Sequence, residues 1–290
     1  MVKKIDLTQA QYHKTVYDTW SNRKYEKYKN SQWRWADLPF RDYITNGNYL
    51  FKEYLNQNVY KKIENKSILE IGSAMGSAYS FLQKSGLVDL SKFTGIEVSK
   101  VGFEYCKKKY PGGNWLNEDF TMLKNIEGFD YSFERNAIHH MPNPLKAYEK
   151  VFKSTRIAFS TCFRSCLKGK TISDLELSNF KTLTGIYYSS IINLFELTEL
   201  ALKNGFRNIK ITYGGAHEII SNDPKSNHYI SPLINQKKIF LSRCKVFMIK
   251  TESKKPIISF ISRPDVLIKN LSAIFIIINK LNKIKEKFYS

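Results

Sequence analysis

The chain has 290 residues, of which 42% are hydrophobic and 14% aromatic, and it carries a formal net charge of +20. This length and apolar content exclude a disordered chain and favour one α/β domain with additions. The longest strongly apolar run, Ala273 to Ile278, is far shorter than the ~20 residues of a spanning helix, and no signal peptide is expected because no apolar stretch follows the N-terminal lysines.

Residues 1–66 are predicted to be helical, because apolar and aromatic residues recur at helical spacing from Tyr12 to Trp20 and from Tyr49 to Tyr60. Turn formers at 37–39 and 46–48 interrupt the pattern. Two interpretations stay open: a helical cap whose aromatic side chains pack on the main domain, which we favour, and a lid that lines a substrate pocket.

After Lys66, short apolar strands alternate with helices. The strands are predicted at residues 67–71, 93–97, 115–119, 129–135 and 156–161, and the helices at 78–84, 101–110 and 142–153. This alternation indicates βαβ units. We therefore expect an α/β domain over residues 67–251, with a mostly parallel central sheet and helices on both faces.

The second half of this domain is predicted to end in a helix and two strands. Residues 194–203 form an amphipathic helix that Asn204-Gly205 ends, and residues 209–213 and 244–251 form the strands. A polar loop of about thirty residues separates these strands, and loops of that length are usually functional or mobile.

Residues 252–290 are expected to be a basic tail, in which residues 262–290 form an amphipathic helix. Its apolar residues repeat at spacings of three and four, and five lysines accompany them. Three interpretations of the apolar stripe stay open: contact with an anionic membrane surface, a homodimer contact, and packing on the protein's own core.

The sharpest motif is Glu70-Ile-Gly72-Ser73-Ala-Met-Gly76, which lies between a predicted strand and a predicted helix. Glycines permit a tight turn and close backbone approach, and the carboxyl ends of parallel strands are where such sheets bind ligands. The spacing is neither that of a GxGxxG dinucleotide site nor that of a phosphate loop. This argues against NAD and ATP.

A second motif lies about 25 residues later, where the predicted strand Phe93-Thr-Gly-Ile-Glu97 ends in an acid. A carboxylate at this place can accept hydrogen bonds from both hydroxyls of a ribose. A surface glutamate at a strand end is the alternative, but the spacing from the glycine motif favours a binding role.

These motifs resemble those of class I S-adenosylmethionine-dependent methyltransferases, which have a Rossmann-like fold. The resemblance covers roughly residues 60–251 and includes Asn117-Glu-Asp119-Phe120 as a third motif and the stretch 129–144, with Ile138-His139-His140, as a fourth. It departs in lacking a Lys-Pro-Gly-Gly turn before the fifth strand, which leaves the start of that strand uncertain.

The resemblance implies S-adenosylmethionine as cofactor and a role for each matching residue. Glu70 and Gly72 would face its methionine part, Ser73 would belong to the same cofactor site, Gly76 would let helix and loop pack closely, and Glu97 would bind the ribose. Asp119 and Phe120 would flank the adenine, and Arg135 would lie near the sulfonium and the substrate. Carboxylates that bind metal in some relatives are absent here, and the four cysteines show no metal-ligand spacing, so we expect no metal and a cytosolic compartment.

A hydroxyl acceptor needs a base, and histidine is the side chain with the most suitable pKa. His139 and His140 follow the fourth strand, where the acceptor should enter, so we assign them as catalytic candidates. The alternative is that one of them caps the following helix or satisfies loop backbone. Further candidates for the pocket or for the base are Tyr187, Tyr188, His217 and His228.

The prediction is therefore an S-adenosylmethionine-dependent O-methyltransferase that acts on a small molecule. The resemblance outside the cofactor motifs favours a sugar or sugar nucleotide of surface polysaccharide biosynthesis, in the cytoplasm or at the inner face of the membrane. The positive charge suits such an anionic acceptor, although a composition rich in Lys, Asn and Ile explains the charge equally well. Alternatives are another small metabolite, an RNA-binding protein or RNA methyltransferase, and a non-catalytic interaction protein; no RNA-binding motif is present.

Overall fold

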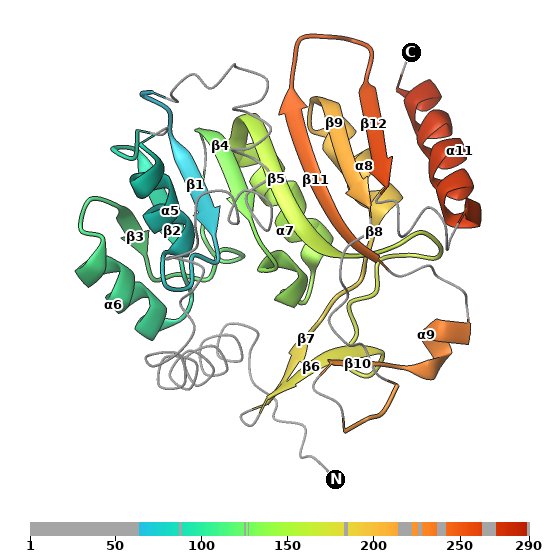
Figure 1. The fold of residues 1–290 in the computed structure, drawn as a ribbon, viewed down its shortest axis with the longest axis horizontal. Coiled ribbons are helices and arrows are strands. Elements are labelled where there is room, and N and C mark those ends of the chain that lie inside the picture. The colour runs from blue at the N-terminus through green and yellow to red at the C-terminus, as the bar shows by residue number, and fades with distance from the viewer. Residues whose placement is uncertain are drawn as a thin grey trace.

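Figure 1 shows the computed structural model of the chain. The structure describes residues 64–86, 89–124, 126, 128–182, 185–213, 222–225, 228–236, 242–262 and 271–288. The predicted N-terminal cap lies outside these residues except for its last three, and so does His217.

A mostly parallel sheet forms the centre of the molecule (Figure 1). Its strands are β1 (Ile68–Ile71), β2 (Phe93–Ile96), β3 (Asn114–Leu116), β4 (Phe129–Glu134), β5 (Thr155–Cys166), β8 (Ile192–Asn193), β9 (Phe206–Tyr213), β11 (Ser242–Lys250) and β12 (Ile257–Ser262). The order across the sheet is β12-β9-β11-β5-β4-β1-β2-β3, with β8 paired to β5. Among the described pairings in this sheet, those of β11 with β5 and β9 are antiparallel and the others are parallel, which confirms the predicted fold class.

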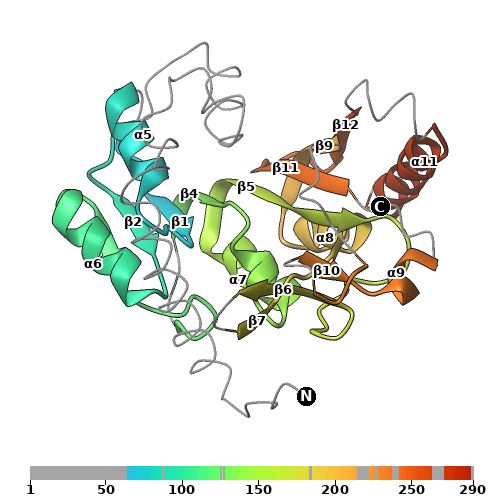
Figure 2. The same ribbon diagram turned by 60° about the horizontal axis from the view of Figure 1, so that its bottom comes forward.

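Helices cover both faces of this sheet (Figures 1 and 2). One face carries α5 (Ser77–Ser85) and α6 (Lys100–Lys109), and the other carries α7 (Pro144–Ser154), α8 (Leu194–Lys203) and α11 (Leu271–Lys287). The alternation of side chains along β1 explains this layering, because Ile68 packs in the cluster under α5 and α6, whereas Leu69 and Ile71 pack in the cluster under α7, α8 and α11.

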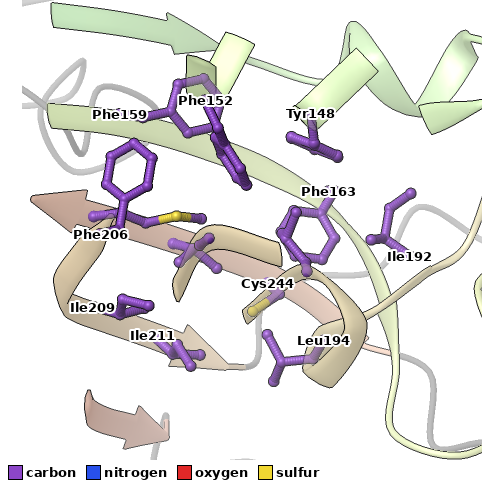
Figure 3. Packing of buried hydrophobic residues seen from close by; sticks show 14 of the residues in the cluster. Tyr148, Phe152, Phe159, Phe163, Ile192, Leu194, Phe206, Ile209, Ile211 and Cys244 are labelled. Atoms are coloured by element: carbon purple, nitrogen blue, oxygen red, sulfur yellow. The ribbon is translucent and has the colours of Figure 1, made fainter. Parts of the chain in front are cut away.

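The larger of the two cores lies between α7, α8 and the sheet, and Figure 3 shows part of it. Aromatic rings fill its centre: the ring of Phe152 lies 5.3 Å from that of Phe159 and 5.1 Å from that of Phe206, in edge-to-face contacts. This rigid layer supports β4 and β5, whose carboxyl ends lead to the candidate site.

The structure corrects the predicted boundaries of the fifth strand. β5 begins at Thr155, directly after α7 ends at Ser154, and runs to Cys166 rather than stopping at Thr161. Pairing explains the extension, since β11 continues alongside β5 to Ser165 and β8 joins it at Ser165 and Cys166.

A second, small antiparallel sheet follows β5 and was not predicted. It consists of β10 (His228–Ile230), β6 (Ser178–Thr182) and β7 (Gly185–Tyr188), and α9 (Pro232–Gln236) follows β10. It lies beyond the carboxyl ends of β4 and β5 (Figure 1). The region between β9 and β11, predicted as a polar loop, therefore contains a strand and a short helix in its described residues.

The predicted tail helix is found over Leu271–Lys287, as α11, but an earlier part of the predicted tail, Ile257–Ser262, forms strand β12 and pairs with β9 in the central sheet. The structure also shows what the apolar stripe of the helix does. Ile277, Leu281 and Ile284 of α11 are buried in the same cluster as α7 and α8. Of the three interpretations, packing on the protein's own core is therefore the one the structure shows. Phe275 and Ile278 remain exposed on the same helix, so a membrane or homodimer contact stays a prediction. No helix in the described ranges is long and apolar enough to cross a membrane.

Candidate functional site

The candidate site lies where the strand order reverses. β1 has β2 on one side and β4 on the other, and the chain leaves β1 toward α5 and leaves β4 toward α7, on opposite faces of the sheet. Sheets of this kind bind ligands in the crevice at the carboxyl ends of such strands. The cofactor-site residues predicted from the sequence lie at the carboxyl end of β1 and in the segments after β1, β2, β3 and β4.

The turn after β1 needs its glycines for conformation and for packing. Gly72 and Gly76 have φ angles of +73° and +71°, and Ala74 between them has a φ angle of 51°. A Cβ atom on Gly72 would lie 2.5 Å from the Cβ of Ala137, and one on Gly76 would lie 2.9 Å from the ring of Tyr110. Gly72 thus brings the turn against the segment after β4, and Gly76 brings it against the end of α6.

Ser73 fixes the same turn to β2. Its backbone N–H donates to the carbonyl of Ile96 at 3.1 Å, and its hydroxyl donates to the same oxygen at 3.4 Å. The Ser73 side chain is buried and contributes to the shape of the turn.

Glu70, at the carboxyl end of β1, is only 7% exposed. Its Oε2 is buried and makes no hydrogen bond within the described part of the chain. Burial raises the pKa of Glu70 to about 8, an effect that the positive charge of Arg135 opposes and the negative charge of Glu97 reinforces. Since buried polar atoms are usually hydrogen-bonded, this oxygen is an acceptor suited to a ligand that brings an N–H group.

Glu97 connects the turn to the end of β2. Its Oε2 accepts from the backbone N–H of Ala74 at 2.6 Å and its Oε1 from that of Ser99 at 2.8 Å. Asn117 adds a second link, because its Nδ2 donates to the carbonyls of Glu97 and Val98. Carboxylate oxygens accept more than one hydrogen bond, so the predicted contact with ribose remains compatible with these links.

Asp119 follows β3 and resembles Glu70 in having one unused oxygen. Its Oδ1 accepts from the backbone N–H and the hydroxyl of Thr121, at 2.8 and 2.7 Å, whereas Oδ2 is buried and has no hydrogen-bond partner among the described residues. The next residue, Phe120, is 2% exposed and packs in the core under α7 and α8. Its ring therefore lies in the core, and its predicted position beside adenine stays a prediction.

Glu134 ends β4, and sequence reasoning missed it. Its Oε2 accepts from the backbone N–H groups of Ala137 and Ile138, at 2.8 and 3.2 Å, and its Oε1 accepts from the hydroxyls of Tyr148 and Thr161. It thereby holds the segment that presses Ala137 against Gly72. The signal was available, because Glu134, like Glu70 and Glu97, is an acid where a predicted strand ends. Arg135 follows it directly and is close enough to influence the pKa of Glu70.

The two histidines lie in a short 3₁₀ helix, Ile138–His140, and their ring centroids are 4.0 Å apart. His139 is buried, and its carbonyl accepts from the backbone N–H of Ser190 at 2.8 Å. His140 Nδ1 lies 2.7 Å from the carbonyl oxygen of Tyr188. A carbonyl can only accept, so Nδ1 carries the proton and, in the neutral ring, Nε2 carries the lone pair.

This geometry tests the structural alternatives for the histidines and leaves their catalytic assignment a prediction. Neither histidine caps α7, because the side chain of Asn143 does so by accepting from the backbone N–H of Lys146. His140 does satisfy a backbone group, the carbonyl of Tyr188, and the same contact orients its ring.

The remaining pocket candidates belong to the small sheet. The ring of His140 lies 6.3 Å from that of Phe180, which lies 6.1 Å from that of Tyr187. Tyr188 contributes its carbonyl to His140. The backbone of His228, in β10, pairs with that of Phe180 in β6, and the side chain of His228 lies outside the described part of the chain.

Among the described residues, no group of three or more His, Cys, Asp or Glu side chains is arranged to hold a metal ion. The four cysteines, all of them described, are buried and form no disulfide.

No protein-family model and no curated protein matches the chain. Several solved structures are similar to the chain. Magnesium protoporphyrin IX methyltransferase from Synechocystis PCC 6803 with bound S-adenosylmethionine is similar at a TM-score of 0.53 and 10% identity, over 86% of this chain and 100% of that chain. The fold is the Rossmann-like methyltransferase fold.

Two further structures support the same assignment of the fold. The Synechocystis enzyme with bound S-adenosylhomocysteine has a TM-score of 0.51 and 12% identity, over 82% of this chain and 100% of that chain. A protein from Galdieria sulphuraria, provisionally assigned as a sarcosine dimethylglycine methyltransferase, has a TM-score of 0.52 and 12% identity, over 81% of this chain and 99% of that chain. At these identities the similarity establishes the fold alone.

Proposed function

We propose that the chain is an S-adenosylmethionine-dependent methyltransferase. One observation carries the proposal: on a methyltransferase fold, Glu70 and Asp119 each hold one buried carboxyl oxygen that has no hydrogen-bond partner in the described ranges, at the carboxyl edge of the sheet. S-Adenosylmethionine has an N–H donor at each of its ends, the ammonium of its methionine part and the amino group of its adenine. The two unused acceptors fit a ligand with that pattern of donors.

When bound, the cofactor supplies a methyl group already activated on a sulfonium. The residues of the chain have the task of binding and orientation. Glu70 would accept from the ammonium, Asp119 from the adenine amino group, and Glu97 from the ribose hydroxyls. Gly72 and Ser73 would bring backbone close to the ligand, and the charge of Arg135 would lie beside Glu70 near the acceptor.

We propose His140 as the base for a hydroxyl acceptor. Its Nδ1–H is held by the Tyr188 carbonyl, so its Nε2 is the nitrogen that would take the proton from the hydroxyl. A carbonyl partner on Nδ1 fixes the ring orientation and tautomer that a general base needs. His139 is the less suitable candidate, because it is buried and packs against the ring of His140.

Calorimetry tests the cofactor assignment. The protein is titrated with S-adenosylmethionine and S-adenosylhomocysteine, with ATP and NAD as control nucleotides, and the titration is repeated with Asp119→Asn. We expect binding of the first two ligands only, and an affinity for S-adenosylhomocysteine about tenfold to a hundredfold weaker in the variant, because a hydrogen bond to a charged group contributes about 1.5–3 kcal/mol. Equal binding of ATP, or unchanged affinity in a folded variant, would contradict the assignment.

For the acceptor, we propose a hydroxyl of a sugar or sugar nucleotide, as in surface polysaccharide biosynthesis. The net charge of +20 supports an anionic, nucleotide-linked acceptor. Incubation with labelled S-adenosylmethionine and a panel of sugar nucleotides tests this, and transfer to another small metabolite instead would replace it. Retention on heparin with a steep salt dependence, together with label on RNA, would favour the nucleic-acid alternative.

The location at the inner membrane face is a separate proposal, which the exposed Phe275 and Ile278 and the lysines of α11 support. Liposome flotation tests it by comparing the protein with a Phe275→Ser/Ile278→Ser variant on anionic vesicles. Flotation that the variant loses supports the proposal, whereas equal behaviour of both proteins contradicts it.

A further inference from the structure

The segment after β3 is attached to the rest of the molecule at both of its ends. At its start, Asn117 donates to the carbonyls of Glu97 and Val98, at 2.9 and 3.1 Å. At its end, the ammonium of Lys150, which comes from α7, donates to the backbone carbonyls of Phe120, Thr121 and Leu123. An ammonium has three N–H donors, and here all three have backbone acceptors in one short segment.

Between these two attachments, Asp119 is oriented through one of its oxygens. Oδ1 accepts from the N–H and hydroxyl of Thr121, and the backbone carbonyl of Asp119 accepts from the N–H of Met122 at 2.9 Å. These contacts form a tight turn whose shape sets the direction of Oδ2, the buried oxygen without a hydrogen bond. Thr121 links this turn to Lys150. Its N–H and hydroxyl donate to Asp119 Oδ1, and its backbone carbonyl accepts one of the three hydrogen bonds from the Lys150 ammonium.

Lys150 is well placed to resist movement of this turn. Its ammonium lies 2.7 Å from the Phe120 carbonyl and 5.2 Å from the centre of the Phe120 ring, which is itself packed in the core. Hydrogen bonds from a charged donor are stronger than neutral ones. α7 is packed against the sheet through Tyr148, Val151 and Phe152, so it forms a rigid support for the lysine.

We propose that Lys150 is a positioning residue that fixes the turn of Asp119 so that Oδ2 selects a purine with an exocyclic amino group over one with an oxo group. This inference rests on the proposed function. Oδ2 of Asp119 can accept a hydrogen bond from an amino group on the purine. If the purine carries an oxo group instead, two acceptor oxygens face each other without a proton between them. A site built to receive a donor rejects an analogue that lacks it, provided that the acceptor is held in place.

The experiment compares two ligands by calorimetry: S-adenosylhomocysteine and S-inosylhomocysteine, which carries an oxo group where adenine has its amino group. The variant is Lys150→Met, which keeps the length of the side chain and removes its donors. The matched control is Lys153→Met on the same helix, because Lys153 is exposed and pairs only with Glu149 one turn away among the described residues. Asp119→Asn serves as the reference for loss of the acceptor.

In the wild-type protein and in Lys153→Met, we expect S-adenosylhomocysteine to bind about tenfold to a hundredfold more tightly than the inosine analogue. In Lys150→Met, we expect this ratio to fall to within about threefold of unity, as in Asp119→Asn. The ratio matters more than the affinity itself, since a general loss of stability weakens both ligands together and leaves their ratio unchanged. If Lys150→Met does not fold, Lys150→Gln, which keeps a shorter polar side chain, takes its place.

The outcomes separate this inference from the proposed function. A wild-type protein that binds neither ligand refutes the cofactor assignment itself. A wild-type protein that binds both equally, or a Lys150→Met variant that keeps the wild-type ratio, leaves the cofactor assignment standing and overturns the role of Lys150.

Discussion

Replacing Glu70 with Gln should make the ligand-free protein more stable and make it bind S-adenosylhomocysteine less well. Burial raises the pKa of Glu70 from the ordinary 4.5 to about 8. The folded protein therefore keeps this proton where the unfolded chain has lost it, so the contribution of Glu70 to folding stability is full below pH 4.5 and is lost as the pH rises toward 8. Each pH unit in that range costs about 1.4 kcal/mol, which gives up to about 4 kcal/mol lost at pH 7.5.

Glutamine carries no charge at any pH and avoids this cost, but it still leaves a buried polar atom without a partner. We therefore expect Glu70→Gln to gain about 1–4 kcal/mol at pH 7.5 and little at pH 4.5. Urea unfolding across pH 4.5–8 measures the difference, and calorimetry measures an affinity for S-adenosylhomocysteine reduced about tenfold to a hundredfold.

The matched control is Glu149→Gln, an exposed carboxylate paired with Lys153, which should change stability by less than about 0.5 kcal/mol. Two results would refute the reasoning. A stability difference that does not change with pH would show that Glu70 is not held in an environment that disfavours its charge. Unchanged affinity for the ligand would show that its free oxygen does not receive the ammonium.

Three further substitutions test other parts of the account. His140→Ala should lower turnover about 10²–10⁴-fold and abolish the acid limb of the pH–rate profile, while S-adenosylhomocysteine still binds normally. A variant that retains the acid limb, or a larger loss of turnover in His139→Ala, would argue against His140 as the base. Gly72→Ala should cost about 2 kcal/mol or more in urea unfolding, because its φ is +73° and its Cβ would lie 2.5 Å from that of Ala137; a loss below about 0.5 kcal/mol contradicts this contact. Leu281→Ala should cost about 2–5 kcal/mol whereas Phe275→Ala, at an exposed position of the same helix, should cost little; similar values would mean that α11 does not pack as described.

The sequence was informative where local chemistry determines the structure. The helix over residues 194–203 is found at the predicted residues because Asn193 caps its start and Asn204-Gly205 ends it. The acids at the ends of β1 and β2 were also recognisable, since each follows a short apolar run. Periodicity could predict a stripe on α11 but not its partner, because the same stripe suits a membrane, a second subunit or the protein's own core.

Features that depend on distant contacts were not predictable. β6 and β10 pair across almost fifty residues, and β12 forms only because β9 offers it an edge. Glu134 has a role only because the turn after β4 brings the N–H groups of Ala137 and Ile138 back onto its carboxylate. The hydrogen bonds from Lys150 to the segment after β3 likewise join residues about thirty positions apart in the sequence, and the local sequence of α7 does not predict them.

The most direct test of the central claim is a crystal structure of the protein with S-adenosylhomocysteine. We expect Glu70 Oε2 to lie within hydrogen-bonding distance of the amino group of the homocysteine part and Asp119 Oδ2 within that distance of the adenine amino group, so that both oxygens gain the partners they lack among the described residues. A ligand bound elsewhere, or bound at this edge of the sheet with both oxygens still unpaired, would contradict it.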